Sequence, residues 1–491
     1  MSYMTPIDYA VIVVYSIIAL VIGYFATRRT KSVADYFVGG WKVPWWLSAV
    51  SHHVSGYSAF AFVAYAGIAY RYGFTIYTIW ALTISIGLLI GALIFAPRWG
   101  ALGKKGVLSP LQYLEERFNL PTRVGIAVSF TSIKFIDLGL KIFSLAVFLN
   151  AFVGLDIVWS IIIAGVLTIA YMVTGGILAS IWTDFAQAII QFTPTIILFI
   201  VALQAVGGFD GLISKAPPGF WQPLSGPYDF WYWLAFLIVV TLSYCGATLN
   251  LAQRFISVGA AKEARKVALL SAILYLTYPV VMFTPMWIAR VLYPNLDKPD
   301  YAYAVIARDF LPKIAPGLLG FMLVSLFAAT MSMIDSDLNS LSAVFTVDLY
   351  GRLKKVSDEK KLLKIAQIIT LVFGIIMIIA SFIPLAFPQA GGIFNIMVDW
   401  YAGLLGPIGI PLLLGLVYKH TTWRGAIASW AGGFIVWAIF KYGLKTPWTI
   451  TTWAELITSF VIFFFEPIIT RKIAKISTEE IKRIEKFFEG L

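Results

Sequence analysis

Two short polar runs interrupt long apolar stretches of this sequence, and they hold side chains suited to binding an ion or a small solute. Residues 51–58 include three serines and two histidines, and residues 241–250 include two threonines, a serine and an asparagine. Hydroxyls and backbone carbonyls are oxygen ligands for a hard cation, and neutral imidazole can accept, donate or carry a proton. Small polar residues also join helices within membranes, so one such run is ambiguous. Two runs at a regular spacing favour a binding site.

Helices that cross a membrane must position these two runs. Of the 491 residues, 60% are hydrophobic and only 13% are charged, and the mean hydropathy is +0.84. Soluble proteins typically have about 25% charged residues and about 45–50% apolar ones. Lipid must therefore surround most of the chain, and we predict an all-α polytopic membrane protein. The single cysteine, Cys245, excludes disulfides within the chain and any cysteine-based metal site.

A crossing takes about 20 apolar residues, and reading the sequence in this way predicts about 13 transmembrane helices. The polar runs fall in the second and the seventh of them. The predicted crossings lie near residues 8–27, 45–70, 73–97, 122–153, 157–175, 181–206, 231–255, 264–293, 316–346, 363–384, 391–419, 424–441 and 449–470.

Basic residues alternate between successive loops. The connections at 98–123 and 347–362 are rich in Lys and Arg, whereas those at 154–156 and 385–390 contain none. The positive-inside rule then places the N-terminus outside and the C-terminus in the cytoplasm, as an odd number of crossings requires. We therefore assign the net charge of +12 to topology in the cell membrane and expect no nucleic-acid partner.

The positions of the interrupted spans predict an inverted repeat. With the first span set aside, spans 2–6 and 7–11 form two groups of five, and each group opens with an interrupted span. An odd group size inverts the second group in the membrane, which is typical of transporters whose site lies between two broken helices. The predicted parts are a leading helix and first inner loop (1–34), the first repeat (35–206), an outer loop (207–230), the second repeat (231–420), two trailing helices (421–470) and a cytoplasmic basic amphipathic tail on the inner leaflet (471–491).

Four segments of the sequence resemble the sodium:solute symporter family, which includes sodium-coupled sugar, proline and sialic acid carriers. A fifth segment, Gly403–Gly425, adds the late glycine- and proline-rich pattern of that family. The resemblance runs in order from about residue 35 to 426. It implies a LeuT-like 5+5 inverted repeat and sodium-driven symport of a small organic solute by alternating access. The four segments are Asp35–Gly40 with Pro44–Trp46, Gly175–Gln187, Gln253-Arg254 with Ala261–Arg265, and Ala328–Ser336 with Asp348–Tyr350.

The resemblance also implies a sodium site between the first and the eighth core helices. Four of its positions fall on Ser51, Val54, Ala329 and Ser332, which would offer backbone carbonyls freed by the helix break and a hydroxyl. The fifth position falls on Met333, where the family usually has Ser or Thr. A thioether is a poor ligand for a hard ion, so this position departs from the pattern.

Three hypotheses accommodate the methionine. A cation could bind nearby at Asp184, Asp335 and Ser336, since some family members have a further site on the same helices. Alternatively, Asp184, Asp335 or a histidine carries a proton in place of sodium. In the third hypothesis a water molecule fills the missing position.

The solute positions carry over less completely. Asp399 falls where the sugar carriers have a glutamine, and it would favour a cationic solute group, bind a proton, or pair with a lysine such as Lys141. Lys141 belongs to a charged set on the fourth span that also contains Lys134 and Asp137, at i, i+3 and i+7. The solute-binding residues implied by the resemblance and by the first polar run are His53, Ser55, Ser58, Trp80, Thr248, Asp399 and Tyr401.

The sequence thus predicts a sodium-coupled symporter. Two hypotheses compete with it: a proton-coupled symporter on the same fold, and a solute receptor that transports nothing. No grouped nucleophile, base or metal ligands indicate an enzyme, and sodium is the only ion expected. The expected partners are sodium, the bilayer and a small solute whose class, sugar, amino acid or carboxylate, stays open.

Overall fold

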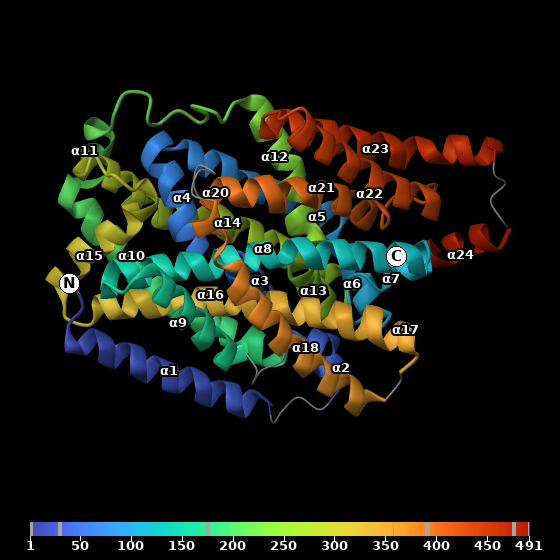
Figure 1. Cartoon of the computed structure of the whole chain (residues 1–491), viewed down its shortest axis with the longest axis horizontal. Coiled ribbons are helices and arrows are strands. Elements are labelled where there is room, and N and C mark those ends of the chain that lie inside the picture. The colour runs from blue at the N-terminus through green and yellow to red at the C-terminus, as the bar shows by residue number, and fades with distance from the viewer. Residues whose placement is uncertain are drawn as a thin grey trace.

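The computed structural model describes residues 3–27, 32–172, 177–356, 358–387, 393–473, 478–489 and 491, and every regular element among them is a helix. Most helices run along the long axis of the molecule (Figure 1). The N-terminus lies at one end of this axis and the C-terminus lies toward the other (Figure 1). Termini at opposite ends agree with an odd number of crossings.

The first half of the chain begins with α1 (Pro6–Thr27), α2 (Val33–Val38) and a short 3₁₀ turn, η1 (Gly39–Trp41). It continues through a further set of helices, two of which, α8 and α10, have 30 residues or more. These are α3 (Trp45–Val54), α4 (Ala59–Tyr72), the π-helical η2 (Tyr77–Leu82), α5 (Thr83–Ile94), α6 (Ala96–Lys104), α7 (Tyr113–Arg117), α8 (Leu120–Val153), α9 (Ile157–Met172), α10 (Ile177–Val206) and α11 (Gly208–Lys215).

The second half is also helical and ends in an amphipathic segment. Four of its elements are π-helical turns that continue a neighbouring α-helix. Its elements are α12 (Phe230–Leu242), η3 (Ser243–Ala247), α13 (Leu249–Ser257), α14 (Ala261–Leu292), η4 (Pro299–Tyr301), α15 (Ala302–Ile314), α16 (Leu318–Ala343), η5 (Val344–Gly351), α17 (Arg352–Lys354), α18 (Glu359–Ala380), α19 (Ile383–Ala386), α20 (Ile393–Ile396), η7 (Met397–Ala402), α21 (Gly403–Leu414), α22 (Trp423–Ala438), η8 (Ile439–Gly443), α23 (Trp448–Ile473) and α24 (Thr478–Glu489).

Among the described residues, eight helices are long and apolar enough to cross a membrane, or nine if the bent pair around Trp400 counts as one crossing. Two shorter apolar segments lie within α1 and α9, at Pro6–Ile18 and Ile157–Ile169. Each predicted crossing coincides with one or more helices. Several of these helices are too short, or are broken by a bend, to be identified as membrane spans from their length alone. The number thirteen therefore stays a prediction.

The break predicted in the first polar run is present between α3 and α4. A Cβ on Gly56 would lie 1.7 Å from the hydroxyl oxygen of Tyr275 on α14, so only glycine fits there. The backbone N–H of Ala59, at the start of α4, donates to Thr330 Oγ1 of α16 at 2.9 Å. This bond supplies a partner for one of the N–H groups that a helix start leaves open.

The second predicted break is present where η3 gives way to α13. Gly246 has φ of +141°, which strongly favours glycine, and a Cβ there would overlap the indole of Trp99. The indole Nε1–H of Trp99 donates to the carbonyl oxygen of Cys245 at 2.8 Å, and Thr248 is extended. The helix α6, in the first half of the chain, thus supplies a hydrogen-bond donor to the backbone at the break.

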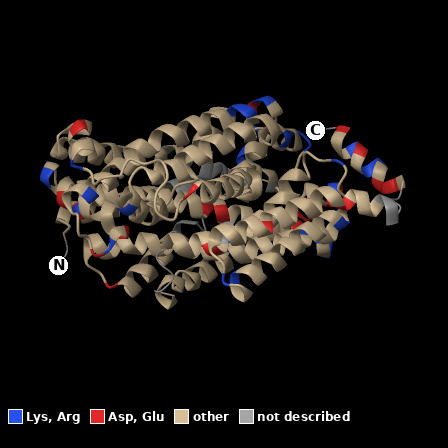
Figure 2. Ribbon diagram, turned by 90° about the horizontal axis from the view of Figure 1, so that it is seen from above, with Lys and Arg blue, Asp and Glu red and all other residues tan. Residues whose placement is uncertain are grey.

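Burial separates central from peripheral helices. In the apolar stretch of the span that includes α16, 83% of the residues are buried. The corresponding share is 28% for the span that includes α18 and 33% for α23. Large apolar side chains are exposed along α1, α18 and α23, where lipid would cover them. Charged residues gather mainly toward the two ends of the molecule (Figure 2).

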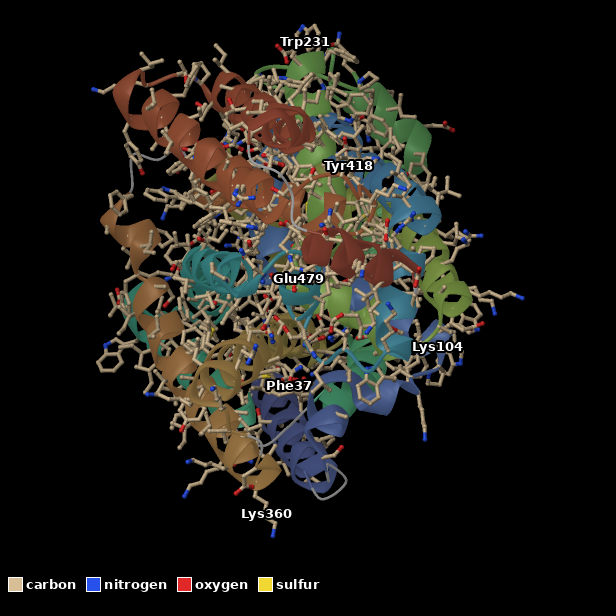
Figure 3. All side chains as sticks on the ribbon, turned by 90° about the vertical axis from the view of Figure 1, so that its right-hand side faces the viewer. Phe37, Lys104, Trp231, Lys360, Tyr418 and Glu479 are labelled. Atoms are coloured by element: carbon tan, nitrogen blue, oxygen red, sulfur yellow. The ribbon has the colours of Figure 1, made fainter. Side chains whose placement is uncertain are left out.

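The ends of the bundle follow the predicted alternation of the loops. The helices α6, α7, α17 and α24 lie at one end, and α11 and α15 lie at the other (Figure 1). The helix α24 crosses the face of its end, where Glu479 lies near the centre of the view (Figure 3). Its Phe487 ring stacks on Tyr113 of α7 at 5.8 Å, and Ile484 is buried. The predicted amphipathic tail therefore packs part of its apolar face on protein.

Candidate functional site

A cavity of about 90 Å³ lies between the two helix breaks, and α8 and α16 also contribute to its wall. Of the predicted solute residues, Ser55, Ser58, Trp80 and Thr248 line it, and Met333 does so as well. The other lining residues used below are Tyr65, Lys134, Asp137, Lys141, Phe236 and Tyr244.

The N-termini of two half-helices lie at this cavity. Ser58 is the N-cap of α4, and its hydroxyl accepts from the backbone N–H of Phe60 at 3.3 Å. Thr248 precedes α13, and its Oγ1 lies 2.6 Å from Ser243 Oγ. A helix N-terminus carries partial positive charge and favours electron-rich groups nearby. The cavity thus offers an oxygen-bearing solute both hydroxyl partners and favourable helix dipoles.

Four charged residues, which we call the cavity cluster, bring α8 and α16 together: Lys134, Asp137, Lys141 and Asp337. The ammonium groups of both lysines lie 2.7 Å from Asp137 Oδ2, and Lys134 Nζ lies 3.0 Å from Asp337 Oδ1. Lys141 is also paired with Asp337. Asp337 is fully buried, whereas the Asp137 side chain keeps 11% exposure toward the cavity. The cluster is therefore neutral overall, with Asp137 its most accessible member.

The sequence indicated that the three charged residues of α8 share one face of a helix. It offered Lys141 as a possible partner for Asp399. The structure pairs Lys141 with Asp137 and Asp337 instead. Asp337 follows Met333 by four residues on α16, so both lie on one helix face. This i, i+4 relation was the signal that would have added Asp337 to the site.

Aromatic side chains form another part of the cavity wall. The rings of Tyr65 and Trp80 lie 5.0 Å apart, and Tyr57 lies 5.1 Å from Trp80. Phe236 and Tyr244 from the region of the second break also line the cavity. Aromatic faces pack well against apolar C–H surfaces, while the cavity cluster offers polar contacts. The cavity therefore suits a solute with both kinds of surface.

The predicted sodium ligands are brought to neighbouring buried positions on α3 and α16, which pack together. The carbonyl oxygen of Ser51 accepts from the N–H of Ser55 at 2.8 Å, and that of Val54 accepts from Tyr57 at 3.0 Å. A backbone carbonyl oxygen has two lone pairs, so it can in general bind an ion while it accepts one hydrogen bond. Ala329 and Ser332 are buried on the facing helix. The oxygen set is thus compatible with a hard cation, while Met333 lines the solute cavity.

Arg254 of α13 reaches into the space beside this site. Its Nε–H donates to Ser51 Oγ at 2.9 Å, and its Nη2 donates to Ser336 Oγ at 2.6 Å. Nη2 also lies 3.3 Å from Ser55 Oγ, and the arginine is fully buried. We call Ser51, Ser55, Arg254 and Ser336 the cation junction. In the sequence, Arg254 was part of the Gln253-Arg254 segment that resembles the symporter family.

His53 is not among the residues that line the cavity. Its ring lies within an aromatic group, 4.8 Å from Tyr57, 4.5 Å from Tyr275 and 5.8 Å from Tyr278. The backbone carbonyl of His53 accepts from the Tyr275 hydroxyl at 2.9 Å. The structure therefore places this imidazole in the packing of the break, behind the wall of the cavity.

Asp399 also lies apart from the cavity wall. Its Oδ2 is 2.6 Å from Lys441 Nζ, and both side chains are partly exposed. The hypotheses that needed an unpaired Asp399, or one paired with Lys141, do not agree with this contact. The side chains of Asp184 and Tyr401 lie outside the described residues. Asp335 is buried on α16 beside Ser336.

Comparison with known proteins identifies the family of this chain. The model of the sodium:solute symporter family matches residues 36–433. The sodium/glucose cotransporter of Vibrio parahaemolyticus is 29% identical over 457 residues, covering 86% of this chain and 82% of that relative. The sodium/sialic acid symporter SiaT of Proteus mirabilis (strain HI4320) is 27% identical over 460 residues, covering 89% and 90%.

Solved structures show the same architecture. A Na⁺-coupled sialic acid symporter in its substrate-bound outward-open state superposes with a TM-score of 0.82 at 23% identity, covering 95% of this chain and 98% of that one. The inward-facing transporter Mhp1 gives 0.57 at 13% identity, covering 90% and 94%. The predicted LeuT-like fold is confirmed.

Proposed function

The chain belongs to the sodium:solute symporter family, and we propose that its solute is a small polyhydroxylated molecule of the sugar class. The family consists of membrane transporters, and sodium-coupled symport is the function of this chain. The observation that carries the proposal is the neutral cavity cluster facing an aromatic wall between the two breaks.

Hydroxyl groups match the cavity cluster because each one both donates and accepts. A hydroxyl can donate to Asp137 and accept from a lysine without changing the net charge of the cluster. A solute with an isolated net charge would have to disturb a buried ion-pair set, and breaking such pairs is costly. The C–H face of a sugar ring would pack on aromatic side chains such as Trp80.

The names of the relatives fit this solute class. They include carriers of glucose and sialic acid and the sodium/myo-inositol cotransporter 2 of Mus musculus, which is 26% identical over 490 residues. Each of these solutes is polyhydroxylated, and sialic acid has a carboxylate in addition. We carry over only this shared chemistry to the present chain.

For coupling, we propose that sodium binds between α3 and α16 at Ser51, Val54, Ala329 and Ser332. Met333 would supply no ligand, and water would fill the fifth position. An ion that binds one conformation better than the other biases the equilibrium, and about 1–3 kcal/mol of coupling is typical. The two repeats (35–206 and 231–420) would rock against each other in the cell membrane, with the N-terminus outside and the C-terminus in the cytoplasm.

The test starts with melting of the purified protein in sodium or in choline, with glucose, myo-inositol, sialic acid or proline added. Sodium-dependent stabilisation by a polyol is expected, followed by sodium-driven uptake of that compound into proteoliposomes. Stabilisation by proline alone would contradict the sugar class, and uptake independent of sodium would contradict the coupling.

A matched pair of variants locates the solute. Asp137→Asn is expected to raise the half-saturating solute concentration at least tenfold, because it replaces the accessible carboxylate of the cavity cluster by an amide, which lacks the charge and one of the two acceptor oxygens. Asp399→Asn changes an aspartate paired with Lys441 outside the cavity wall and should leave that concentration within about twofold. A larger rise in the half-saturating concentration for Asp399→Asn than for Asp137→Asn would indicate that the solute binds at Asp399.

A further inference from the structure

One acidic residue, Glu455, lies inside the apolar part of α23. The apolar stretch of this span covers Trp448–Thr470, and Glu455 is seven residues, or about 10 Å, from its start. The side chain is fully buried, and within the described part of the chain neither carboxyl oxygen has a hydrogen-bond partner. An ionisable residue at such a depth in the membrane is costly, so by default it marks a functional site.

The carboxyl group of Glu455 faces the backbone of α21. A Cβ on Gly406 of α21 would lie 3.2 Å from Glu455 Oε1. The next residue, Pro407, has no N–H, so the carbonyl of Gly403, four residues earlier, lacks its usual partner within the helix. On α23, Thr452 lies one turn before Glu455, and its buried hydroxyl is also without a partner among the described residues. This part of the α21–α23 interface thus contains a carboxyl group, a hydroxyl and a backbone carbonyl that need hydrogen-bond partners.

Among the described residues, no charged side chain contacts this carboxyl group. The elements packed against α23 are mainly α12, α21, α22 and η8. The helix α21 has no ionisable residue, Lys441 of η8 is paired with Asp399, and Arg424 of α22 lies over the ring of Trp423. The remaining ionisable residues on these elements and on α23 itself are Tyr232, Tyr442, Glu466, Arg471 and Lys472.

Burial without a partner decides the form of this carboxyl group. An ionised carboxylate only accepts hydrogen bonds, and burying it without a cation costs more free energy than holding a proton. The protonated form is neutral and can donate, which suits the open carbonyl of α21. We propose that Glu455 binds a proton within the membrane and keeps it as a neutral carboxyl group at the α21–α23 contact. The inference goes beyond the proposed function, because Glu455 is not part of the wall of the solute cavity.

Infrared difference spectroscopy of the purified full-length protein at pH 7 tests this proposal. The spectrum of the unmodified protein minus that of Glu455→Gln should show the C=O stretching band of a protonated carboxyl group, shifted in D₂O. The control is Glu466→Gln on the same helix. Glu466 accepts from the N–H of Thr422 at 3.2 Å and from its hydroxyl at 2.6 Å, which suits a carboxylate, so this variant should keep the band. A difference spectrum for Glu455→Gln without the band would overturn the proposal.

The ions in the buffer separate a bound proton from a bound metal cation. The band should be the same in sodium, potassium and choline buffers of equal ionic strength. Its loss in sodium alone would overturn the proposal and indicate a sodium ion at Glu455. If Glu455→Gln does not fold, the unmodified protein decides. Exposed carboxyl groups are ionised at pH 7, so a spectrum with no protonated carboxyl band at that pH would also overturn the proposal.

A melting series measures the consequence for stability. In the unfolded chain a glutamate is ionised above about pH 5, so unfolding releases the bound proton and stability falls as the pH rises. The melting temperature of the unmodified protein should therefore fall more steeply between pH 6 and pH 9 than that of Glu455→Gln, which has no such proton to release. Parallel curves for the two proteins would contradict the proposal.

Discussion

Two clusters of charged residues connect α8 to the continuous helix formed by α16 and η5. One lies beside the cavity and the other lies nearer one end of the bundle. The cavity cluster uses lysines and aspartates, and its four side chains are at most 11% exposed. The second, which we call the inner cluster, consists of Glu115, Arg123, Asp348 and Arg352 at the end where α24 docks. There the exposure rises from 0% at Asp348 to 47% at Arg352.

The difference follows from what each cluster must do. An arginine fork fixes its carboxylate at two points, and Arg352 contacts Glu115 in this way through Nε and Nη2. A lysine is a compact charge with rotatable donors, so it can exchange a carboxylate for a solute hydroxyl. We infer that the inner cluster is a structural clamp and that the cavity cluster is an adaptable binding surface. Four predictions test this contrast, from the largest expected effect to the smallest.

Asp337→Asn should cause the largest loss of stability. It leaves two buried lysines with one carboxylate, and breaking a buried pair typically costs about 3–5 kcal/mol. The measurement is denaturant unfolding of the detergent-solubilised protein, with the exposed Asp297→Asn as the control. Equal stability of the two variants would mean that the cavity cluster is not formed.

Asp348→Asn should cost less, about 1.5–3 kcal/mol, the usual range for hydrogen bonds to a charged group. Asp348 accepts from Arg123 Nε at 2.8 Å and from Ser109 Oγ at 2.5 Å, but Arg123 keeps its contact with Glu115. The same unfolding measurement applies. A larger loss than that of Asp337→Asn would reverse the ranking of the two clusters.

Glu115→Gln should lower stability only above acidic pH. The hydrogen bond from Arg352 lowers the pKa of Glu115, burial opposes this, and Arg123 contributes further lowering. A lowered folded-state pKa gives stability that is present above the unfolded value and is lost as pH falls through the folded value. Melting curves from pH 7 to pH 3 should therefore converge for the variant and the unmodified protein. Glu116→Gln, at the neighbouring exposed position, is the control. If the stability difference between Glu115→Gln and the unmodified protein stayed the same from pH 7 to pH 3, the lowered pKa of Glu115 would be refuted.

Phe487→Ala should have the smallest global effect and a clear local one. Phe487 packs on Tyr113, and its carbonyl accepts from Lys105 Nζ at 3.4 Å. A terminal helix can detach without unfolding the bundle, so hydrogen exchange should rise in α24 and α7 while global unfolding shifts by less than about 1 kcal/mol. Ile481→Ala, on the exposed face of α24, should leave exchange unchanged. Unchanged exchange in Phe487→Ala would show that the contact does not hold the helix.

Much of the scaffold could be predicted because its signals are local. Apolar length predicted where helices lie, and the polar runs at 51–58 and 241–250 marked both breaks. Gly56 and Gly246 sit at those breaks, where a side chain would collide with Tyr275 or Trp99. Apolar patterns and backbone preferences depend on residues that are close together in the chain. The positions of the helices and of their breaks can therefore be predicted from the sequence.

The site was predicted in part. Ser55, Ser58, Trp80 and Thr248 do line the cavity, whereas His53 does not. His53 lies in the last turn of α3, and sequence spacing alone does not say which side of that turn faces a cavity. Likewise, the departure at Met333 was visible, but not that its side chain lines the solute cavity.

By itself the sequence determined that this chain is a helical membrane protein with two interrupted helices and the motifs of a symporter family. Tertiary structure alone decided which charges meet: Lys141 pairs with Asp337, 196 residues away, and Asp399 pairs with Lys441. It also brought Arg254 to Ser51 and Ser336. A helical pattern fixes which residues share a face, but the rotation and crossing of packed helices fix which faces meet, and these depend on the packing of the whole bundle.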